Sequence, residues 1–126
     1  MLSSVTIGNS VTNIEGYAFY ECTSLTSVTI GDSVTEIGIC AFDGCTSLTS
    51  VTIPDSVTAI GGCAFYGCTS LTEVYCKPIT PPMGGYNMFY NTASNLRIYV
   101  PIESVSAYES ASNWINYKNY IVGYNF

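Results

Sequence analysis

The sequence predicts a β-rich solenoid of about four to five coils that ends in an irregular C-terminal cap containing a short helix. Three observations indicate this fold class: a repeat of fixed length, an alternation of β-branched and polar residues within each repeat, and a low content of charge. Of the 126 residues, 48% are hydrophobic and 10% are charged. A single domain of this size and composition can fill a hydrophobic core, so we do not expect a disordered chain.

The repeat is 23 residues long and starts at Leu2. Residues 25–47 and 48–70 differ at four positions, so 19 of 23 residues are identical. Residues 2–24 differ from 25–47 at eight positions, so 15 of 23 are identical. Such repeats stack as coils, because each coil buries its apolar side against the next. We expect a solenoid over residues 1–101, with regular coils at 2–24, 25–47 and 48–70, a degenerate coil at 71–95 and a last strand at 96–101, followed by a cap at 102–126.

Each coil is expected to contain two short strands. In the second coil, Val28 and Ile30 alternate with polar residues, which indicates a half-buried strand. A Gly-Asp-Ser turn and a second β-rich stretch at 34–37 follow. Gly38, and Gly61 in the next coil, then mark a bend that needs the permissive backbone of glycine. The remaining inward positions of the coil are Leu25, Ala41, Phe42 and Cys45.

The fourth coil departs from this pattern. Residues 77–85 contain three prolines and two glycines, so we expect that the regular second strand does not continue there. Phe89 should take the phenylalanine position of the coil one residue late. Apolar residues spaced by three to four from Val105 to Trp114 predict an amphipathic helix from Ser104 to about Lys118, and a last strand is expected at 120–122. We interpret this end as a seal over the stack rather than a ligand-facing surface.

The repeated unit L-T-S-V-T-I-P-D-S-V-T-x-I-G-x-x-A-F-x-G-C-T-S resembles the BspA-like leucine-rich repeat of bacterial and protozoan surface proteins. Residues 99–108 are also similar to the C-terminal end common in that family. The resemblance implies a right-handed leucine-rich-repeat superhelix, an extracellular or cell-surface location, and adhesion to host or microbial surfaces. It also implies that the outward strand positions line a concave binding face.

The composition excludes several functional classes. The chain has no histidine, which excludes histidine-dependent catalysis. Three bases against nine acids give a net charge of −6, which is unsuited to a nucleic-acid partner. No apolar stretch approaches the roughly 20 residues of a membrane-spanning helix, and the sequence as given carries no secretion signal. We therefore expect no direct membrane insertion. The sequence specifies no facing pair of carboxylates and has no G-x-S-x-G, P-loop or dinucleotide-binding motif, so we expect no enzyme and no cofactor. We also expect no metal site.

The six cysteines follow the repeat. Their short spacing is C-x4-C, which lacks the C-x-x-C pairs of zinc sites. We expect buried free thiols, because cysteine fills buried positions as a small hydrophobic residue. The alternative is a disulfide between Cys40 and Cys63, at the same position of neighbouring coils. One position holds Cys22, Cys45 and Cys68, a second holds Cys40 and Cys63, and Cys76 replaces an isoleucine.

The outward positions of the first strands provide the candidate binding site. In the three regular coils these positions hold serine and threonine, whereas the following strands carry charged and aromatic side chains. Tyrosine and arginine are enriched at the energetic centres of protein interfaces. The alternatives are that the rings pack under the 78–95 loop or the cap helix, and that the chain is a structural spacer without a ligand. The residues expected to contact a protein or glycan are Glu73, Tyr75, Lys77, Arg97 and Tyr99.

The first coil has no preceding cap in this sequence. Its apolar side chains would therefore be exposed at one end of the stack, which invites pairing with a second copy. We expect a homodimer through this coil. The apolar residues concerned are Leu2, Val5, Ile7, Ile14 and Phe19.

Overall fold

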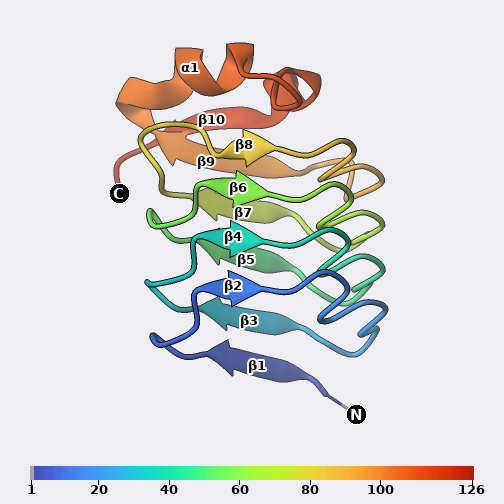
Figure 1. The fold of residues 1–126 in the computed structure, drawn as a ribbon. Coiled ribbons are helices and arrows are strands. Elements are labelled where there is room, and N and C mark those ends of the chain that lie inside the picture. Colours follow the sequence, from blue (N-terminus) through green and yellow to red (C-terminus); the bar gives the residue numbers. More distant parts are fainter. Residues whose placement is uncertain (1) are drawn as a thin grey trace.

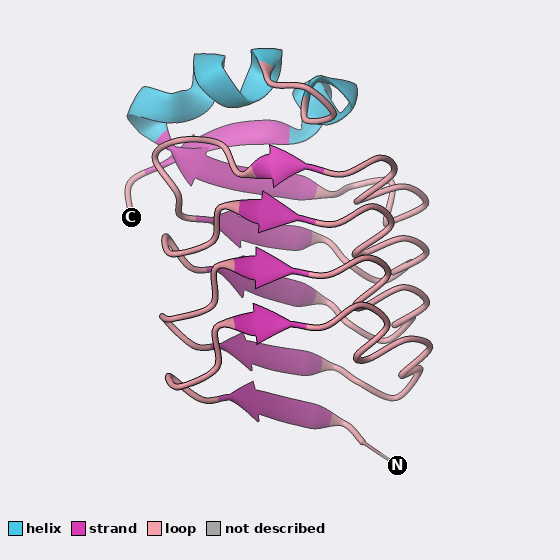
Figure 2. Cartoon of the chain, in the orientation of Figure 1, coloured by secondary structure: helices cyan, strands magenta, loops and turns pink. Residues whose placement is uncertain are grey.

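A computed structural model describes residues 2–126 of the chain. It is a stack of coils with strands on two sides and loops at the edges (Figures 1 and 2). One side carries β1 (Ser4–Ile7), β3 (Ser27–Ile30), β5 (Ser50–Ile53), β7 (Glu73–Cys76), β9 (Arg97–Pro101) and β10 (Ile121–Tyr124). The other side carries β2 (Asn13–Ile14), β4 (Glu36–Ile37), β6 (Ala59–Ile60) and β8 (Met83–Gly84).

Every strand pair is parallel, and the register follows the repeat. Ser4 pairs with Ser27, and Ser50 pairs with Glu73, an offset of 23 residues in both cases. On the second side the strands form one sheet in the order β2-β4-β6-β8. On the first side β1 pairs with β3, and β5, β7, β9 and β10 pair in that order. The repeat solenoid predicted from the sequence is therefore the fold of the chain.

Identical side chains lie above one another inside the stack. Phe19, Phe42, Phe65 and Phe89 form a ladder of near-parallel rings, with successive centroids 5.2, 5.2 and 5.4 Å apart. Leucine, valine and isoleucine ladders line the strands, and most of their members are fully buried. The stacking of Phe89 on Phe65 confirms that the phenylalanine position returns one residue late in the fourth coil.

The glycines at the bend have a different role from the one expected. Gly38 and Gly61 do not have positive φ angles; the glycines that do are Gly44 and Gly67. A Cβ atom on Gly38 would lie 2.5 Å from the Gly16 nitrogen, and one on Gly61 would lie 2.5 Å from the Ile39 nitrogen. These two positions therefore need glycine because neighbouring coils approach too closely for a side chain, not because of an unusual backbone angle.

The second strand continues through the fourth coil, contrary to the expectation. β8 pairs with β6 in parallel, and the Met83 amide donates to the Thr58 carbonyl at 2.8 Å. The three prolines precede β8, so none of them occupies a donor position in the ladder. The extra residue of this coil is absorbed between Cys76 and Met83, in the loop that joins β7 to β8.

The helical segment is shorter than predicted. The α-helix α1 covers only Val105–Ser110, between two 3-10 segments, Ile102–Ser104 and Ile115–Tyr120. The chain leaves the helix because Ala111 is extended and Asn113 has a φ of 66°. The last strand, β10, is present and extends beyond the predicted range.

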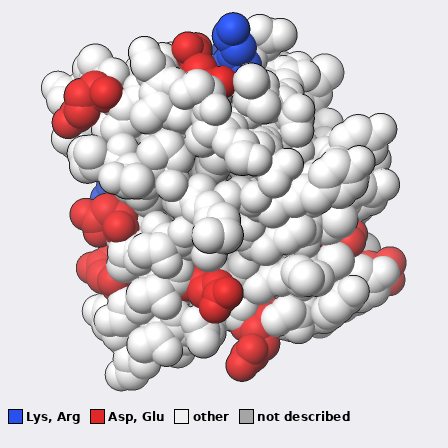
Figure 3. All heavy atoms as spheres, turned by 45° about the horizontal axis from the view of Figure 1, so that its top comes forward, with Lys and Arg blue, Asp and Glu red and all other residues white. Residues whose placement is uncertain are grey.

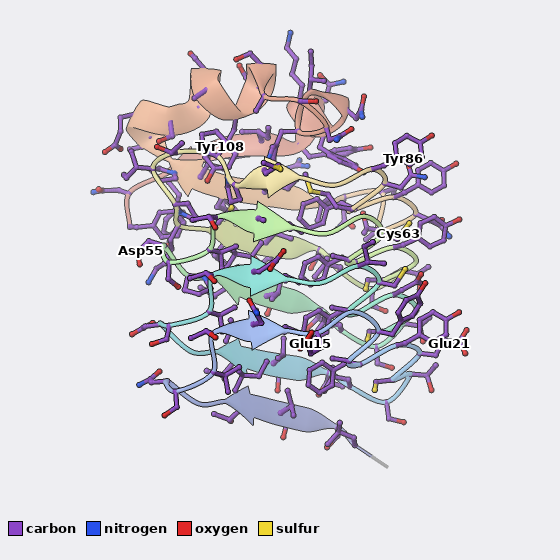
Figure 4. All side chains as sticks on the ribbon, in the orientation of Figure 1. Glu15, Glu21, Asp55, Cys63, Tyr86 and Tyr108 are labelled. Atoms are coloured by element: carbon purple, nitrogen blue, oxygen red, sulfur yellow. The ribbon has the colours of Figure 1, made fainter. Side chains whose placement is uncertain are left out.

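The C-terminal segment packs onto the fourth coil through side chains that bond to the proline-rich loop. The indole Nε1 of Trp114 donates to the Pro82 carbonyl at 2.8 Å, and the Tyr108 hydroxyl donates to the Pro78 carbonyl at 2.6 Å. Tyr117 accepts a hydrogen bond from the Phe89 amide at 3.1 Å. Figure 4 shows Tyr108 between α1 and the strands below it. All three rings are buried.

The six cysteines, all within the described residues, are free, so the Cys40–Cys63 disulfide is not formed. Only three of the six thiols are buried, those of Cys45, Cys68 and Cys76; Cys22, Cys40 and Cys63 are half-buried. The expectation of buried thiols is therefore wrong for the three half-buried cysteines. Cys40 and Cys63 lie on the outer edge of the loops, and Cys22 belongs to the end coil.

Candidate functional site

The outward face of the first side of the stack, which carries β1, β3, β5, β7, β9 and β10, changes character at β7. The outward positions of β1, β3 and β5 hold serine and threonine. From β7 onward, Glu73 lies opposite Arg97, and Tyr75 lies opposite Tyr99. The two tyrosine rings stack with centroids 5.0 Å apart and an interplanar angle of 14°. The parallel register therefore brings together four of the five residues that the sequence singled out.

Tyr124 and Phe126 complete an aromatic cluster that sequence reasoning missed. The Tyr124 ring meets Tyr75 and Tyr99 edge-on, at centroid distances of 5.7 and 5.4 Å. Phe126 packs on Tyr124 at 4.7 Å. Tyr124 is placed there because β10 pairs in parallel with β9, opposite Pro101. Extending the predicted last strand and pairing it with residues 96–101 would have found this residue.

The tyrosines of the patch are half-buried and pack against the C-terminal strand. Tyr124, which meets the Tyr75 and Tyr99 rings edge-on, belongs to β10 rather than to the 78–95 loop or the cap helix. Burial, followed by the charge of Glu73 and a hydrogen bond with it, raises the pKa of Tyr75. The Tyr75 hydroxyl therefore stays protonated at neutral pH and donates its proton to the Glu73 carboxylate.

The charged residues of the patch face outward. Arg97 is exposed, and its Nη1 atom donates to the Leu96 carbonyl at 3.0 Å. Lys77 is exposed directly after β7, and its backbone amide donates to the Ile53 carbonyl at 3.0 Å. Both exposed bases thus place positive charge at the C-terminal end of the strand face.

A cavity of about 330 Å³ lies beside the aromatic cluster. Lys77 and two carboxylates supply its charged groups, and its apolar part includes the last two aromatic rings of the chain together with Ile79 and Pro101. Figure 4 shows Asp55, one of the residues that line this cavity, at the left edge of the stack. The side chains concerned are Lys77, Asp55, Glu103, Tyr124 and Phe126.

Two other features are absent from the described residues. Among residues 2–126, no group of three or more His, Cys, Asp or Glu side chains is arranged to hold a metal ion. Over the same residues, no helix has the length and apolar character needed to cross a membrane. What the site offers is stacked aromatic rings, hydrogen-bond donors and charges of both signs.

Comparisons with known proteins agree with this architecture. The family described as "BspA type Leucine rich repeat region (6 copies)" matches residues 1–116. A crystal structure of a leucine-rich repeat protein from Bacteroides ovatus ATCC 8483 is similar, with a TM-score of 0.75 and 31% sequence identity over 98% of this chain. The match covers 30% of that protein, so the chain spans less than a third of its length. No curated protein sequence matches the chain.

Proposed function

The chain belongs to the BspA-type leucine-rich repeat family, and we propose that it is a non-catalytic recognition module that binds a protein or a glycan through its strand face. In this proposal residues 1–101 form the solenoid of four to five coils, and residues 102–126 form its cap. The proposed location is extracellular or on a cell surface, with adhesion to host or microbial surfaces as the role. The location and the role rest on the family.

The observation that carries the proposal is the aromatic cluster of Tyr75, Tyr99 and Tyr124. Its rings present both flat faces and edges, and its hydroxyls provide hydrogen bonds. Arg97 and Lys77 add positive charge, and Glu73 adds negative charge, at the borders of the cluster. Tyrosine and arginine carry much of the binding energy in protein interfaces, and tyrosine also stacks on apolar ring faces.

The test is a binding assay against purified surface proteins and a glycan array. The double variant Tyr75→Ala with Tyr99→Ala should reduce binding by about tenfold or more, as expected when centrally placed aromatic residues are removed. The matched control is Thr6→Ala with Thr29→Ala, on the same face of the first coils. Circular dichroism should show that all three proteins are folded.

The second candidate is a structural spacer, favoured by the uniform serine and threonine surface of β1, β3 and β5. Five coils at the strand spacing would give a rigid stalk roughly 20–25 Å long. Binding that is unaffected by the tyrosine substitutions, or absent in the wild type, would favour the spacer. Binding that is lost in the tyrosine variant and kept in the threonine control would exclude it.

We also propose that the 126-residue chain self-associates through its first coil. β1 and β2 are edge strands of their sheets. Between them lies a cavity of about 380 Å³ with a mainly apolar lining that includes Val5, Ile7 and Phe19. Leu2 is exposed, and Val5 and Phe19 are half-buried. Ile7 and Ile14 are buried, so the expectation that they would be exposed is wrong for these two residues, because their side chains point into the stack. A second copy could cover this apolar surface and pair with the free strand edges.

A further inference from the structure

The loop edge of the first, third and fourth coils carries five tyrosines, four of them exposed, here called the tyrosine ridge. This edge lies on the right in Figure 1, away from the aromatic cluster of the strand face. The side chains of Tyr17 and Tyr86 are 58% and 71% exposed. Figure 4 shows Tyr86 and Glu21 along this edge, pointing away from the stack. The ridge consists of Tyr17, Tyr20, Tyr66, Tyr86 and Tyr90.

Backbone hydrogen bonds between the loops hold the ridge in order. The Glu21 amide donates to the Asp43 carbonyl at 2.7 Å, and the Gly67 amide donates to the Tyr90 carbonyl at 2.9 Å. Tyr66 and Tyr90 stack at 5.5 Å, and Tyr17 and Tyr20 meet edge-on at 5.4 Å. Four of the five rings therefore have a neighbouring tyrosine ring, which reduces the conformational freedom that they would lose on binding a partner.

These tyrosines contribute little to the core. The same loops already bury the phenylalanine ladder, and four of the five tyrosines of the ridge are exposed. The second coil carries no tyrosine, so the ridge has two parts, Tyr17 and Tyr20 in the first coil and Tyr66, Tyr86 and Tyr90 in the third and fourth coils. Asp43 of the second coil occupies the repeat position of Tyr20 and Tyr66, between the two parts. Groups of exposed aromatic side chains mark interaction sites. The ridge is thus available to a partner without any change in the fold.

The charges along the ridge specify the kind of partner. The four loop segments 15–24, 38–47, 61–70 and 84–94 contain three acidic residues and no lysine or arginine. In Figure 3 the right-hand edge of the molecule carries acidic side chains and no basic ones. The charge of Glu21, then burial, then the charge of Asp43 raise the pKa of Tyr20, so these carboxylates lie close to the ring. The acidic residues are Glu15, Glu21 and Asp43.

We propose that the tyrosine ridge binds a lysine- or arginine-rich polypeptide segment. The faces of tyrosine rings attract ammonium and guanidinium groups, and the neighbouring carboxylates supply opposite charge for the same groups. A neutral glycan would use the rings but would gain no electrostatic attraction from the carboxylates. The combination of exposed rings with acids and without bases therefore favours a cationic polypeptide. This site is separate from the strand-face cluster, so either site can fail its test without affecting the other.

The experiment measures binding of the full chain to a fluorescent peptide of repeated Lys-Ser pairs, with a Gln-Ser peptide and a neutral dextran as the other probes. The wild type should bind the Lys-Ser peptide and neither of the other two. Binding should weaken strongly at about 0.5 M salt, where charges are screened over a few ångströms. The double variant Glu21→Gln with Asp43→Asn should bind about five- to tenfold more weakly, as expected from losing two partly exposed charge contacts.

Two further variants distinguish an effect of the ridge residues on binding from an effect of the net charge of the protein. The control Asp32→Asn with Glu36→Gln makes the same change in charge away from the ridge and should bind like the wild type. Tyr17→Asn with Tyr20→Ser should also weaken binding; Asn tolerates the φ of 62° at position 17, and Asn87 has a φ of 57° at the equivalent position. Equal loss in the control, equal binding of the Gln-Ser peptide or of dextran, or no binding of the Lys-Ser peptide would each overturn the proposal.

Discussion

The two ends of the solenoid bury the same repeat positions to different extents. At the C-terminal end Phe89 is 2% exposed and Val74 is fully buried, whereas Phe19 and Val5 at the N-terminal end are only half-buried. Trp114 and Tyr117 both contact Phe89, at centroid distances of 5.9 and 5.5 Å. In the described residues, the first coil has only the coil above it as a neighbour (Figure 1).

The difference shows that burial in this fold depends on neighbours more than on residue type. A coil of a solenoid cannot bury its apolar side chains alone, because one of its faces must be covered by the preceding coil or a cap and the other by the following coil or a cap. At the C-terminal end, Trp114 and Tyr108 supply the missing apolar surface and also bond to the carbonyl groups of Pro82 and Pro78. The N-terminal coil instead borders an apolar cavity of about 380 Å³.

Replacing Trp114 by alanine should have the largest effect. The fully buried indole packs against Phe89 and Tyr108 and bonds to Pro82, so its removal should lower the free energy of unfolding by about 3–5 kcal/mol. Urea denaturation measures this change. The control Ile115→Ala, at a neighbouring exposed residue, should stay within about 0.5 kcal/mol of the wild type. Equal effects of the two substitutions would show that this end is not sealed by Trp114.

Replacing Tyr108 by phenylalanine should have a smaller effect. The ring is kept, but the Pro78 carbonyl loses its 2.6 Å hydrogen bond in a buried setting, which should cost about 1–3 kcal/mol. Urea denaturation again gives the value. Tyr120→Phe, at a less buried position of the same segment, is the matched control. An unchanged stability of Tyr108→Phe would mean that water replaces the hydroxyl as the partner of this carbonyl.

The pH dependence of stability should show how the burial of one repeat position increases from the second coil to the third, toward the C-terminal end. Burial raises the pKa of Cys45 to about 11 and that of Cys68, one coil nearer the C-terminus, to about 12, from 9.0. Above the ordinary pKa the unfolded thiol loses its proton while the folded thiol keeps it, so stability falls as the pH rises. Each thiol should contribute a slope of about 1.4 kcal/mol per pH unit within its window.

Urea denaturation from about pH 8 to about pH 12 can separate these contributions. In Cys68→Ala the slope should be reduced up to about pH 12, and in Cys45→Ala only up to about pH 11. The cavity left by either substitution shifts the whole curve without changing its slope. Identical slopes in the wild type and both variants would contradict the predicted titration.

The smallest expected effect concerns self-association of the open end. The wild type should form a dimer whose population rises with concentration, and Phe19→Ser with Val5→Thr should weaken it by several-fold, because less apolar surface is covered. Sedimentation velocity measures the distribution. Ile115→Ser, at the other end, is the control and should behave like the wild type. A wild type that stays monomeric at every concentration would contradict the proposed interface.

The regular coils could be predicted almost completely, because a repeat of fixed length determines the register and the side-chain ladders together. The alternation around Val28 and Ile30 and the late position of Phe89 both follow from counting residues. The second strand at Met83 was missed because proline and glycine content indicates where a strand is unlikely, without showing that these prolines precede the pairing residues.

The cap and part of the site could not be predicted in the same way. The helix was expected to continue through Ala111 because the apolar spacing continues. In the structure the backbone becomes extended at Ala111, and the Trp114 indole that follows bonds to the Pro82 carbonyl. Four residues of the candidate patch follow from the parallel register of β7 and β9. Tyr124 depends on the chain returning beside β9 after the cap, a long-range arrangement without a local signal.

The loop between β7 and β8 has a consequence for the evolution and engineering of the chain. It holds the additional residue of the fourth coil while the strands on both sides keep their parallel pairing. Ile79 and Thr80 at its outer part are exposed. We therefore expect this corner to accept insertions, such as a foreign peptide epitope, at a lower cost than the strands or the tight loops beside the phenylalanine ladder.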